Sequence, residues 1–366
     1  MGKRKICKIV FVILSIFLCV AFYELFGICI AYKKQPEVSN TIKKETQNDS
    51  WNERSENMER AVIIEKNPEA LLQRVRLIRN AKEDIILSTF AFQSDESGKL
   101  ILGALHDAAD RGVHVRLLVD GMESWVDMEG NPYFYGLSSH ENVEIKLYNK
   151  ANPLKPWKMM GRMHDKYLIA DGKTYILGGR NTYNYFLGDF LGHKNYDRDV
   201  LVVCDEPEKE NSVNQLLEYF ETIWEQEDSG YFHDNKKLAN RKSVKNAVLE
   251  LQNGYQKYFE ENKERICDTD YTDETFETEK IALVSNPIHT GPKEPVVWYQ
   301  LGELMKNAKE RVKIHTPYII CNDMMYNTWK EIAERVPDFS IMTNSVANNG
   351  NPFGSADYAR NRNRIL

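Results

Sequence analysis

The residues best suited to chemistry lie in the segment RMHDKYLIADGKTYILGGRN. His164 and Lys166 are two residues apart, so both side chains would point to one face of an extended strand. Gly178 and Gly179 let the backbone come close to a bound group, and Asn181 adds an amide donor beside them. An imidazole, a fixed cation and an amide donor that converge in this way suit an anionic tetrahedral group such as phosphate.

The same residues also permit plainer interpretations. A lone histidine and lysine on a strand often form a solvated edge, and two glycines after a strand often form a turn. A metal site is not expected, because Lys166 would repel a cation and no second histidine lies at ligand spacing. From the residue types alone, a phosphate site and a solvated edge therefore both remain open.

The order of these residues resembles a known signature. H-x-K-x-x-x-x-D followed by G-G-x-N is similar to the motif of the phospholipase D superfamily, which includes cardiolipin synthases, phospholipases, single-motif nucleases and tyrosyl-DNA phosphodiesterases. The resemblance implies that His164 either attacks phosphorus to form a phosphohistidine or protonates the leaving alcohol. It implies that Lys166 and Asn181 bind phosphate oxygens, and that Asp171 completes the catalytic motif in a mainly structural role. No metal or organic cofactor is implied.

Two further positions carry an expectation from this resemblance. The family often has a serine where this chain has Gly179, so the backbone there must replace a hydroxyl donor in binding phosphate. Asp199 is expected to be the carboxylate that orients His164 and sets its tautomer. The resemblance extends from about Ala61 to the C-terminus, and HTPY at residues 315–318 resembles the start of a second repeat.

Alternating helix and strand signals surround these residues. DIILSTFAF, residues 84–92, is typical of a buried strand, and Asp171-Gly172 is a strong hairpin signal between two further strands. Such alternation predicts an α/β fold, and we expect a mixed β-sheet flanked by helices, as in phospholipase D-like proteins. The other expected strands are at residues 113–119, 143–148, 166–170, 174–177 and 199–204, and helices are expected at 98–109 and 214–226.

A short repeat indicates an internal duplication. Asn80-Ala81-Lys82-Glu83 recurs as Asn307-Ala308-Lys309-Glu310, an offset of 227 residues, at the same helix-to-strand junction. We therefore expect one complete repeat and an incomplete second repeat. The expected division is a basic N-terminus (1–8), a transmembrane anchor (9–32), a polar linker (33–60), a first phospholipase D-like domain with the motif (61–226), a charged insertion or connector (227–279) and an incomplete second domain (280–366).

The N-terminal apolar run predicts a membrane anchor. Residues 9–32 are interrupted only by Glu24, and as a helix the run is about 36 Å long, against a hydrocarbon core of about 30 Å. A cleaved signal peptide is the alternative, but its apolar core would be shorter and a small-residue cleavage site would follow. We expect an uncleaved anchor in the cell membrane, with the globular part outside the cytoplasm, because the basic residues cluster most tightly before the run. Glu24 is costly in lipid and would lie near an interface or face a partner helix.

The family's active site needs two histidine motifs, one histidine as nucleophile and one as acid. No other histidine of this chain has a lysine two residues on, and the repeat offset would place a second one at about residue 391. Three explanations are open: a fragment or interrupted gene, two copies that pair their first repeats as single-motif nucleases do, and an inactive remnant. We expect the first, with the second half-site in a separately encoded C-terminal piece; a homodimer partner is the alternative source.

Charge and the membrane anchor favour a phospholipid substrate over nucleic acid. The formal net charge is −6, so a basic nucleic-acid footprint is absent over the chain as a whole. The segment LKPWKMM, residues 154–160, could rest on an anionic lipid surface, although an ordinary loop with a partly buried Trp157 is an equal alternative. We expect phosphatidyl transfer or hydrolysis, most like cardiolipin synthase. A single-motif nuclease and an inactive lipid-binding module are the alternative functions.

Overall fold

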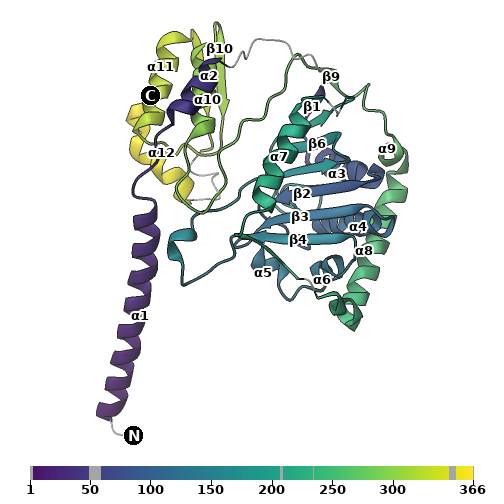
Figure 1. The fold of residues 1–366 in the computed structure, drawn as a ribbon, viewed down its shortest axis with the longest axis horizontal. Helices are drawn as coiled ribbons and strands as arrows, with labels where there is room; N and C mark the ends of the chain where they lie inside the picture. The colour runs from purple at the N-terminus through teal and green to yellow at the C-terminus, as the bar shows by residue number, and fades with distance from the viewer. Residues whose placement is uncertain (1–2, 49–58, 207–208, 234, 346–351, 366) are drawn as a thin grey trace. The chain divides into compact units, whose positions relative to one another are not determined.

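A computed structural model describes residues 3–48, 59–206, 209–233, 235–345 and 352–365. The chain forms two compact units. The first comprises Met1–Lys34, Arg54–Leu283 and Ile288–Pro292, and the second comprises Gln35–Glu53, Val284–Pro287 and Lys293–Leu366. The first unit contains a large β-sheet with helices on its faces (Figure 1).

The sheet of the first unit is mixed. At its centre β2 (Asp84–Thr89), β3 (His114–Asp120) and β4 (Val143–Tyr148) run parallel. β5 (Tyr167–Ala170), β6 (Thr174–Gly178), β7 (Asp199–Val203) and β1 (Arg60–Ile64) follow β2 with antiparallel pairing at every step. The strand order over the described residues is β8-β4-β3-β2-β5-β6-β7-β1-β9. The predicted mixed sheet flanked by helices is thus confirmed.

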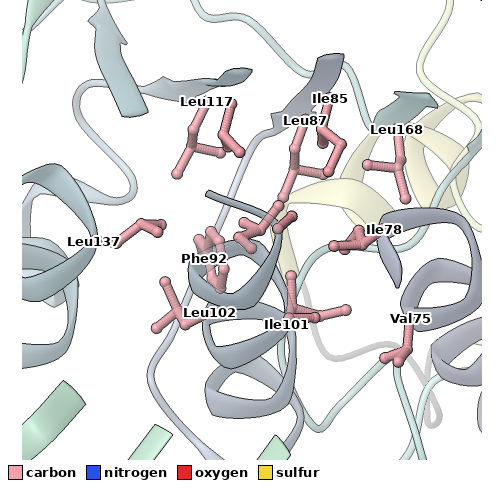
Figure 2. Packing of buried hydrophobic residues seen from close by; sticks show 14 of the residues in the cluster. Val75, Ile78, Ile85, Leu87, Phe92, Ile101, Leu102, Leu117, Leu137 and Leu168 are labelled. Atoms are coloured by element: carbon pink, nitrogen blue, oxygen red, sulfur yellow. The ribbon is translucent and has the colours of Figure 1, made fainter. Parts of the chain in front are cut away.

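Helices cover both faces of this sheet because its central strands are apolar on both sides. On one face Ile85 and Leu87 pack with α3 (Asn67–Asn80) and α4 (Glu96–Asp110), and Figure 2 shows these side chains grouped with Ile78 and Ile101. On the other face Ile86 belongs to a second cluster with α7 (Ser212–Trp224). Each fully buried side chain of this kind contributes about 1.5–3 kcal/mol relative to exposure, so the strand ends are held on a rigid base.

The segment expected to be a charged insertion or connector, residues 227–279, differs from that expectation. β8 (Ser229–Tyr231) extends the sheet beside β4, and α8 (Lys242–Glu261) packs on α4 and α6 (Pro132–Ser138). The contact is close, since a Cβ at Gly103 would lie 2.7 Å from the Leu251 carbonyl oxygen. Buried Leu251 and Tyr255 on α8 belong to the main core, so an amphipathic face within a charged sequence joins this segment to the first unit. It also contains η2 (Lys236–Asn240), α9 (Lys263–Cys267) and β9 (Phe276–Glu277).

The second unit repeats the beginning of the first. α10 (Val296–Lys306), β10 (Arg311–His315), α11 (Asp323–Arg335) and β11 (Asp338–Met342) follow in the order of α3, β2, α4 and β3, and β10 and β11 are parallel. The polar linker expected over residues 33–60 contains α2 (Asn40–Asn48), a short helix of this unit that contacts α10, and its last residue begins β1 of the first unit. Part of the expected linker, residues 49–58, lies outside the described residues. The last helix is α12 (Pro352–Ile365).

Side-chain hydrogen bonds recur at the repeat offset of 227 residues. Thr89 Oγ1 donates to the Ala91 carbonyl at 3.1 Å, and Thr316 Oγ1 donates to the Tyr318 carbonyl at 3.0 Å. Asp95 caps α4 by accepting from the Gly98 amide, and Asn322 caps α11 by accepting from the Met325 amide, both at 3.0 Å. The equivalent residues are Thr89 and Thr316, and Asp95 and Asn322. The internal repeat is therefore present in the hydrogen-bonding geometry as well as in the sequence.

The N-terminal helix α1 (Lys3–Ala31) is apolar over most of its length. Its part Lys8–Ala31 is long and apolar enough to cross a membrane, by length and composition. Phe11 and Phe17 are 71% and 67% exposed, so the rest of the described chain does not cover these side chains.

Candidate active site

Strand directions bring the motif residues to one end of the sheet. His164 and Lys166 come just before β5, and Gly179 and Asn181 come just after β6. Because β5 runs antiparallel to both β2 and β6, the start of β5 lies beside the last residues of the other two strands. Phe90 directly follows β2 and contacts His164, so it belongs to the same place. The four predicted phosphate-site residues therefore lie at a common end of three neighbouring strands.

His164 lies against an aromatic ring and close to a cation. The Phe90 and His164 ring centroids are 4.5 Å apart with an interplanar angle of 59°. Desolvation, and secondarily the positive charge of Lys166, lower the pKa of His164 from 6.5 to about 4. The residue nevertheless remains exposed to solvent. The imidazole is neutral at pH 7, which is the protonation state that a nucleophile requires.

Lys166 is buried and held in place. Its Nζ donates to the His164 carbonyl oxygen at 2.6 Å and lies 5.3 Å from the centre of the Phe90 ring. Desolvation lowers the pKa of Lys166 to about 8, against the opposing effect of nearby carboxylates, Asp165 and Asp197 foremost. The ammonium is therefore mostly charged at pH 7 and is already directed by its hydrogen bond. An ammonium has three N–H donors, so two remain for an anionic ligand.

Asn181 is fixed by the strand end beside it. Its Oδ1 accepts a hydrogen bond from the Ala91 amide at 3.1 Å, and the residue is 7% exposed. The neighbouring backbone is tied to the same strand end, since the Thr182 amide donates to the Ala91 carbonyl and the Gln93 amide donates to the Thr182 carbonyl. This contact directs the amide oxygen toward the protein and leaves Nδ2 as the donor for a ligand. Phosphate binding by the Asn181 amide stays a prediction.

A neighbouring carboxylate leaves no room for a side chain at Gly179. A Cβ at this position would lie 2.1 Å from Asp197 Oδ2, far inside van der Waals contact. A serine could not enter unless Asp197 moved. The Asp197 side chain therefore explains why this chain has glycine where the family often has serine. Phosphate binding by the backbone at this position stays a prediction.

Asp171, which the resemblance places in the catalytic motif in a mainly structural role, lies at the opposite end of β5 from His164. Its Oδ1 accepts hydrogen bonds from the amides of Lys82, Glu83 and Asp84 at 3.1, 2.8 and 3.1 Å. Its φ of +52° puts it in the left-handed region of the turn between β5 and β6. The Asp171 carboxylate therefore ties the β5–β6 turn to the start of β2, and acts on the structure of the strands.

Asp199 does not contact His164, which corrects the predicted orienting role. Its carboxylate is fully buried and forms ion pairs with Arg74 at 2.9 Å and Arg180 at 3.2 Å. Asp199 is the first residue of β7 and pairs in register with Gly178, so its side chain projects toward α3, from which Arg74 comes. The physical reason is that both guanidinium groups are buried and need a counter-charge.

Asp120 is a site residue that the sequence did not single out. It is fully buried at the carboxyl end of β3, where its carboxylate accepts from the Met163 amide and from Arg162 Nη1, both at 3.1 Å. Burial raises the pKa of Asp120, opposed by the charge of Arg162. These contacts fix the chain one residue before His164. The available signal was its place at the carboxyl end of a parallel strand, where α/β sheets carry their sites. Phe90 and Asp197 were also missed.

Comparison with known proteins finds a family that matches the part of the chain containing the motif. The sequence model of the family described as "Cardiolipin synthase, PLD-like domain" matches residues 75–224, which include the whole motif. The first domain belongs to the phospholipase D superfamily. The predicted resemblance is thus confirmed.

Individual relatives show how far the likeness of this phospholipase D-like chain extends. Cardiolipin synthase 1 of Staphylococcus aureus is 37% identical over 124 residues, 34% of this chain and 24% of that protein. An uncharacterized protein of Helicobacter pylori is 26% identical over 337 residues, 84% of this chain and 63% of its own length. The crystal structure of a phosphatidylserine synthase from Haemophilus influenzae is 17% identical with a TM-score of 0.52, and the match covers 88% of this chain and 72% of that one. The chain thus spans less than two thirds of the curated relatives, and the solved structure shows a shared fold.

Proposed function

We propose that the phospholipase D-like domain acts on phospholipids as a phosphatidyltransferase or phosphodiesterase of cardiolipin synthase type. The observation that carries the proposal is geometric: the His164 ring and the hydrogen-bonded Lys166 ammonium lie against the same Phe90 ring at one strand end. A neutral imidazole can attack phosphorus, and a fixed ammonium can hold the phosphate oxygens while charge builds up on them. The names of the relatives, a cardiolipin synthase and a phosphatidylserine synthase, support phospholipid as the substrate class.

In the proposed reaction a bond forms between an imidazole nitrogen of His164 and phosphorus, and the bond from phosphorus to the leaving alcohol oxygen breaks. The product is a phosphohistidine whose phosphorus keeps its lipid. An alcohol or water then attacks phosphorus, breaks the P–N bond and gives its proton to the group that protonated the leaving alcohol. Lys166 and Asn181 Nδ2 are the donors to the non-bridging oxygens throughout.

The proton donor for the leaving alcohol must be a second acid. His164 is neutral before attack and is consumed as the nucleophile, and no other histidine in the sequence has a lysine two residues on. We propose that a second half-site supplies this acid, from a second copy of the chain or from a separate segment with the same motif. With a second half-site present, its histidine could instead be the nucleophile and His164 could be the acid that protonates the leaving alcohol.

We further propose that α1 anchors the enzyme in the cell membrane with the globular units outside the cytoplasm. The apolar stretch Lys8–Ala31 supports the anchor. The basic residues that precede the stretch, Lys3, Arg4 and Lys5, support the orientation.

The test is covalent trapping on the full chain in liposomes that contain phosphatidylglycerol labelled in its acyl chains. An acid-labile, alkali-stable adduct should form on the wild type and be absent in His164→Ala. His114→Ala is the matched control, because His114 lies on β3, at the other end of the sheet from the motif, and should keep the adduct. An adduct that survives His164→Ala contradicts the proposed nucleophile. Binding of the lipid without any adduct, even with a second half-site added, would indicate an inactive lipid-binding module, and an adduct formed only from an oligonucleotide would indicate a nuclease.

A further inference from the structure

A loop just before the motif exposes apolar side chains. Residues 154–160, the contact loop, contain Leu154, Trp157 and Met160, which are 78%, 43% and 59% exposed. Lys155 between them is exposed as well. Three exposed large apolar side chains within one short loop form a patch that water does not favour, and a tryptophan with an adjacent lysine is the composition found at membrane–water interfaces.

The contact loop is held firmly on the first unit. Asn149 Nδ2 donates to the carbonyl oxygens of Lys158 and Gly161 at 2.7 and 2.8 Å. The Lys158 ammonium forms an ion pair with Asp228 at 2.7 Å, and η1 (Pro156–Lys158) gives the loop a helical turn. The exposed apolar side chains are therefore presented by a fixed backbone, which reduces the ordering cost of binding a surface.

The contact loop also contacts the membrane helix of the same unit. Tyr23 Oη on α1 donates to the Leu154 carbonyl oxygen at 2.9 Å. One turn further on, Gly27 lies directly against the loop, since a Cβ there would be 2.5 Å from Pro156 Cγ. Among the residues of α1 whose burial is described, Gly27 is the one that is buried. The absence of a side chain at Gly27 lets the loop and the helix meet.

The level of this contact matches the edge of a bilayer. From Lys8 to the contact with Tyr23 and Gly27 the helix rises about 22–28 Å, and the hydrocarbon core of a bilayer is about 30 Å thick. Glu24 lies between the two contact residues, and a carboxylate is much less costly at the interface than at the centre of the bilayer. The helix therefore places the contact loop at the boundary between acyl chains and headgroups.

We propose that the contact loop inserts Leu154, Trp157 and Met160 into the headgroup boundary of the leaflet from which α1 emerges toward the folded units. The partner is the phospholipid surface itself, with Lys155 facing anionic headgroups. Met160 precedes His164 by four residues, so the loop sets the nucleophile close to the level of lipid phosphates. This last consequence rests on the proposed function, whereas the insertion of the loop does not.

The experiment places a photo-crosslinking benzoylphenylalanine at single positions of the full chain in nanodiscs of phosphatidylethanolamine and phosphatidylglycerol. Mass spectrometry should show a phospholipid adduct on residue 154 and on residue 160. The control is Phe276, which is 74% exposed, comparable to Leu154, but lies on β9 at the opposite edge of the sheet from β4 and should give no lipid adduct. Equal adducts at 276 and 154, or none at 154 and 160, would overturn the proposal. The readout needs no turnover, so a failed trapping experiment at His164 and a failed lipid contact are distinguishable.

A second variant tests whether α1 positions the loop. Gly27→Leu should displace the loop from the helix and abolish the lipid adduct at residue 154. Val20→Phe adds as many side-chain carbons as Gly27→Leu, at an exposed position of the same helix, and should leave the adduct intact. Loss in the first variant with retention in the second supports the proposal. An unchanged adduct in Gly27→Leu would overturn the role of the helix contact.

Discussion

The buried pairing of Asp199 makes a sharp prediction about Asp199→Asn. The substitution keeps the shape of the side chain and removes its charge, while the side chains of Arg74 and Arg180 remain 5% and 0% exposed. Removal of one partner from a buried ion pair typically costs about 3–5 kcal/mol, because the remaining charge stays buried without its counter-charge. We therefore expect a large loss in the free energy of unfolding of the first unit.

The contacts of the two arginines put the expected loss at the lower end of that range. Arg180 also donates to the Ile64 carbonyl at 3.1 Å and to Asn67 Oδ1 at 3.2 Å, and Arg74 donates to the Ala70 carbonyl at 2.9 Å. These bonds survive the substitution, and the Asp199 oxygens contribute charge rather than well-aligned hydrogen bonds. A loss of about 3 kcal/mol is expected, which corresponds to roughly a hundredfold change in the folded-to-unfolded ratio.

The assay is urea unfolding of the full chain in detergent, followed by tryptophan fluorescence. Asp189→Asn, at an exposed aspartate, is the matched control and should unfold with the wild type. NMR titration of carbon-labelled histidine should show that the pKa of His164 in Asp199→Asn stays at its wild-type value. Wild-type stability together with a lower pKa of His164 would refute the assignment, because loss of an orienting carboxylate would destabilise the imidazolium.

Three further predictions concern the motif. Asp171→Asn should lower stability by about 1.5–3 kcal/mol through weakened charge-assisted hydrogen bonds, yet leave the adduct on His164 in the folded protein; loss of the adduct at full stability would contradict this. Lys166→Met should raise the pKa of His164 above about 4, because a nearby positive charge is removed, while desolvation, the larger cause, still keeps the pKa below 6.5. NMR titration of His164 would show an unchanged or lower pKa if the two residues do not interact. Gly179→Ser should lower the thermal unfolding midpoint, and Asp197→Ala in the same chain should restore it, whereas equal midpoints for both variants would rule out the steric account.

The sequence was sufficient for features that depend on neighbours along the chain. The motif residues His164, Lys166 and Asn181, the helix and strand order and the repeat at an offset of 227 residues all rest on spacing, which the chain displays directly. The α/β layering follows from the same spacing, because apolar periodicity determines which elements can bury a face. His164, Lys166 and Asn181 therefore lie near one end of the sheet, and phosphate binding by them stays a prediction.

Tertiary structure alone decided what each carboxylate of the motif region touches. The sequence alone does not distinguish the contacts of Asp171 from those of Asp199. The turn between antiparallel β5 and β6 places Asp171 beside the start of β2. The register of β7 places Asp199 beside Arg74, which is far away along the chain. Asp120 reaches the segment before His164 in the same way, from another strand. A carboxylate binds whichever donors the packing of distant elements brings within about 3 Å, and that distance is set by register and burial rather than by spacing along the chain.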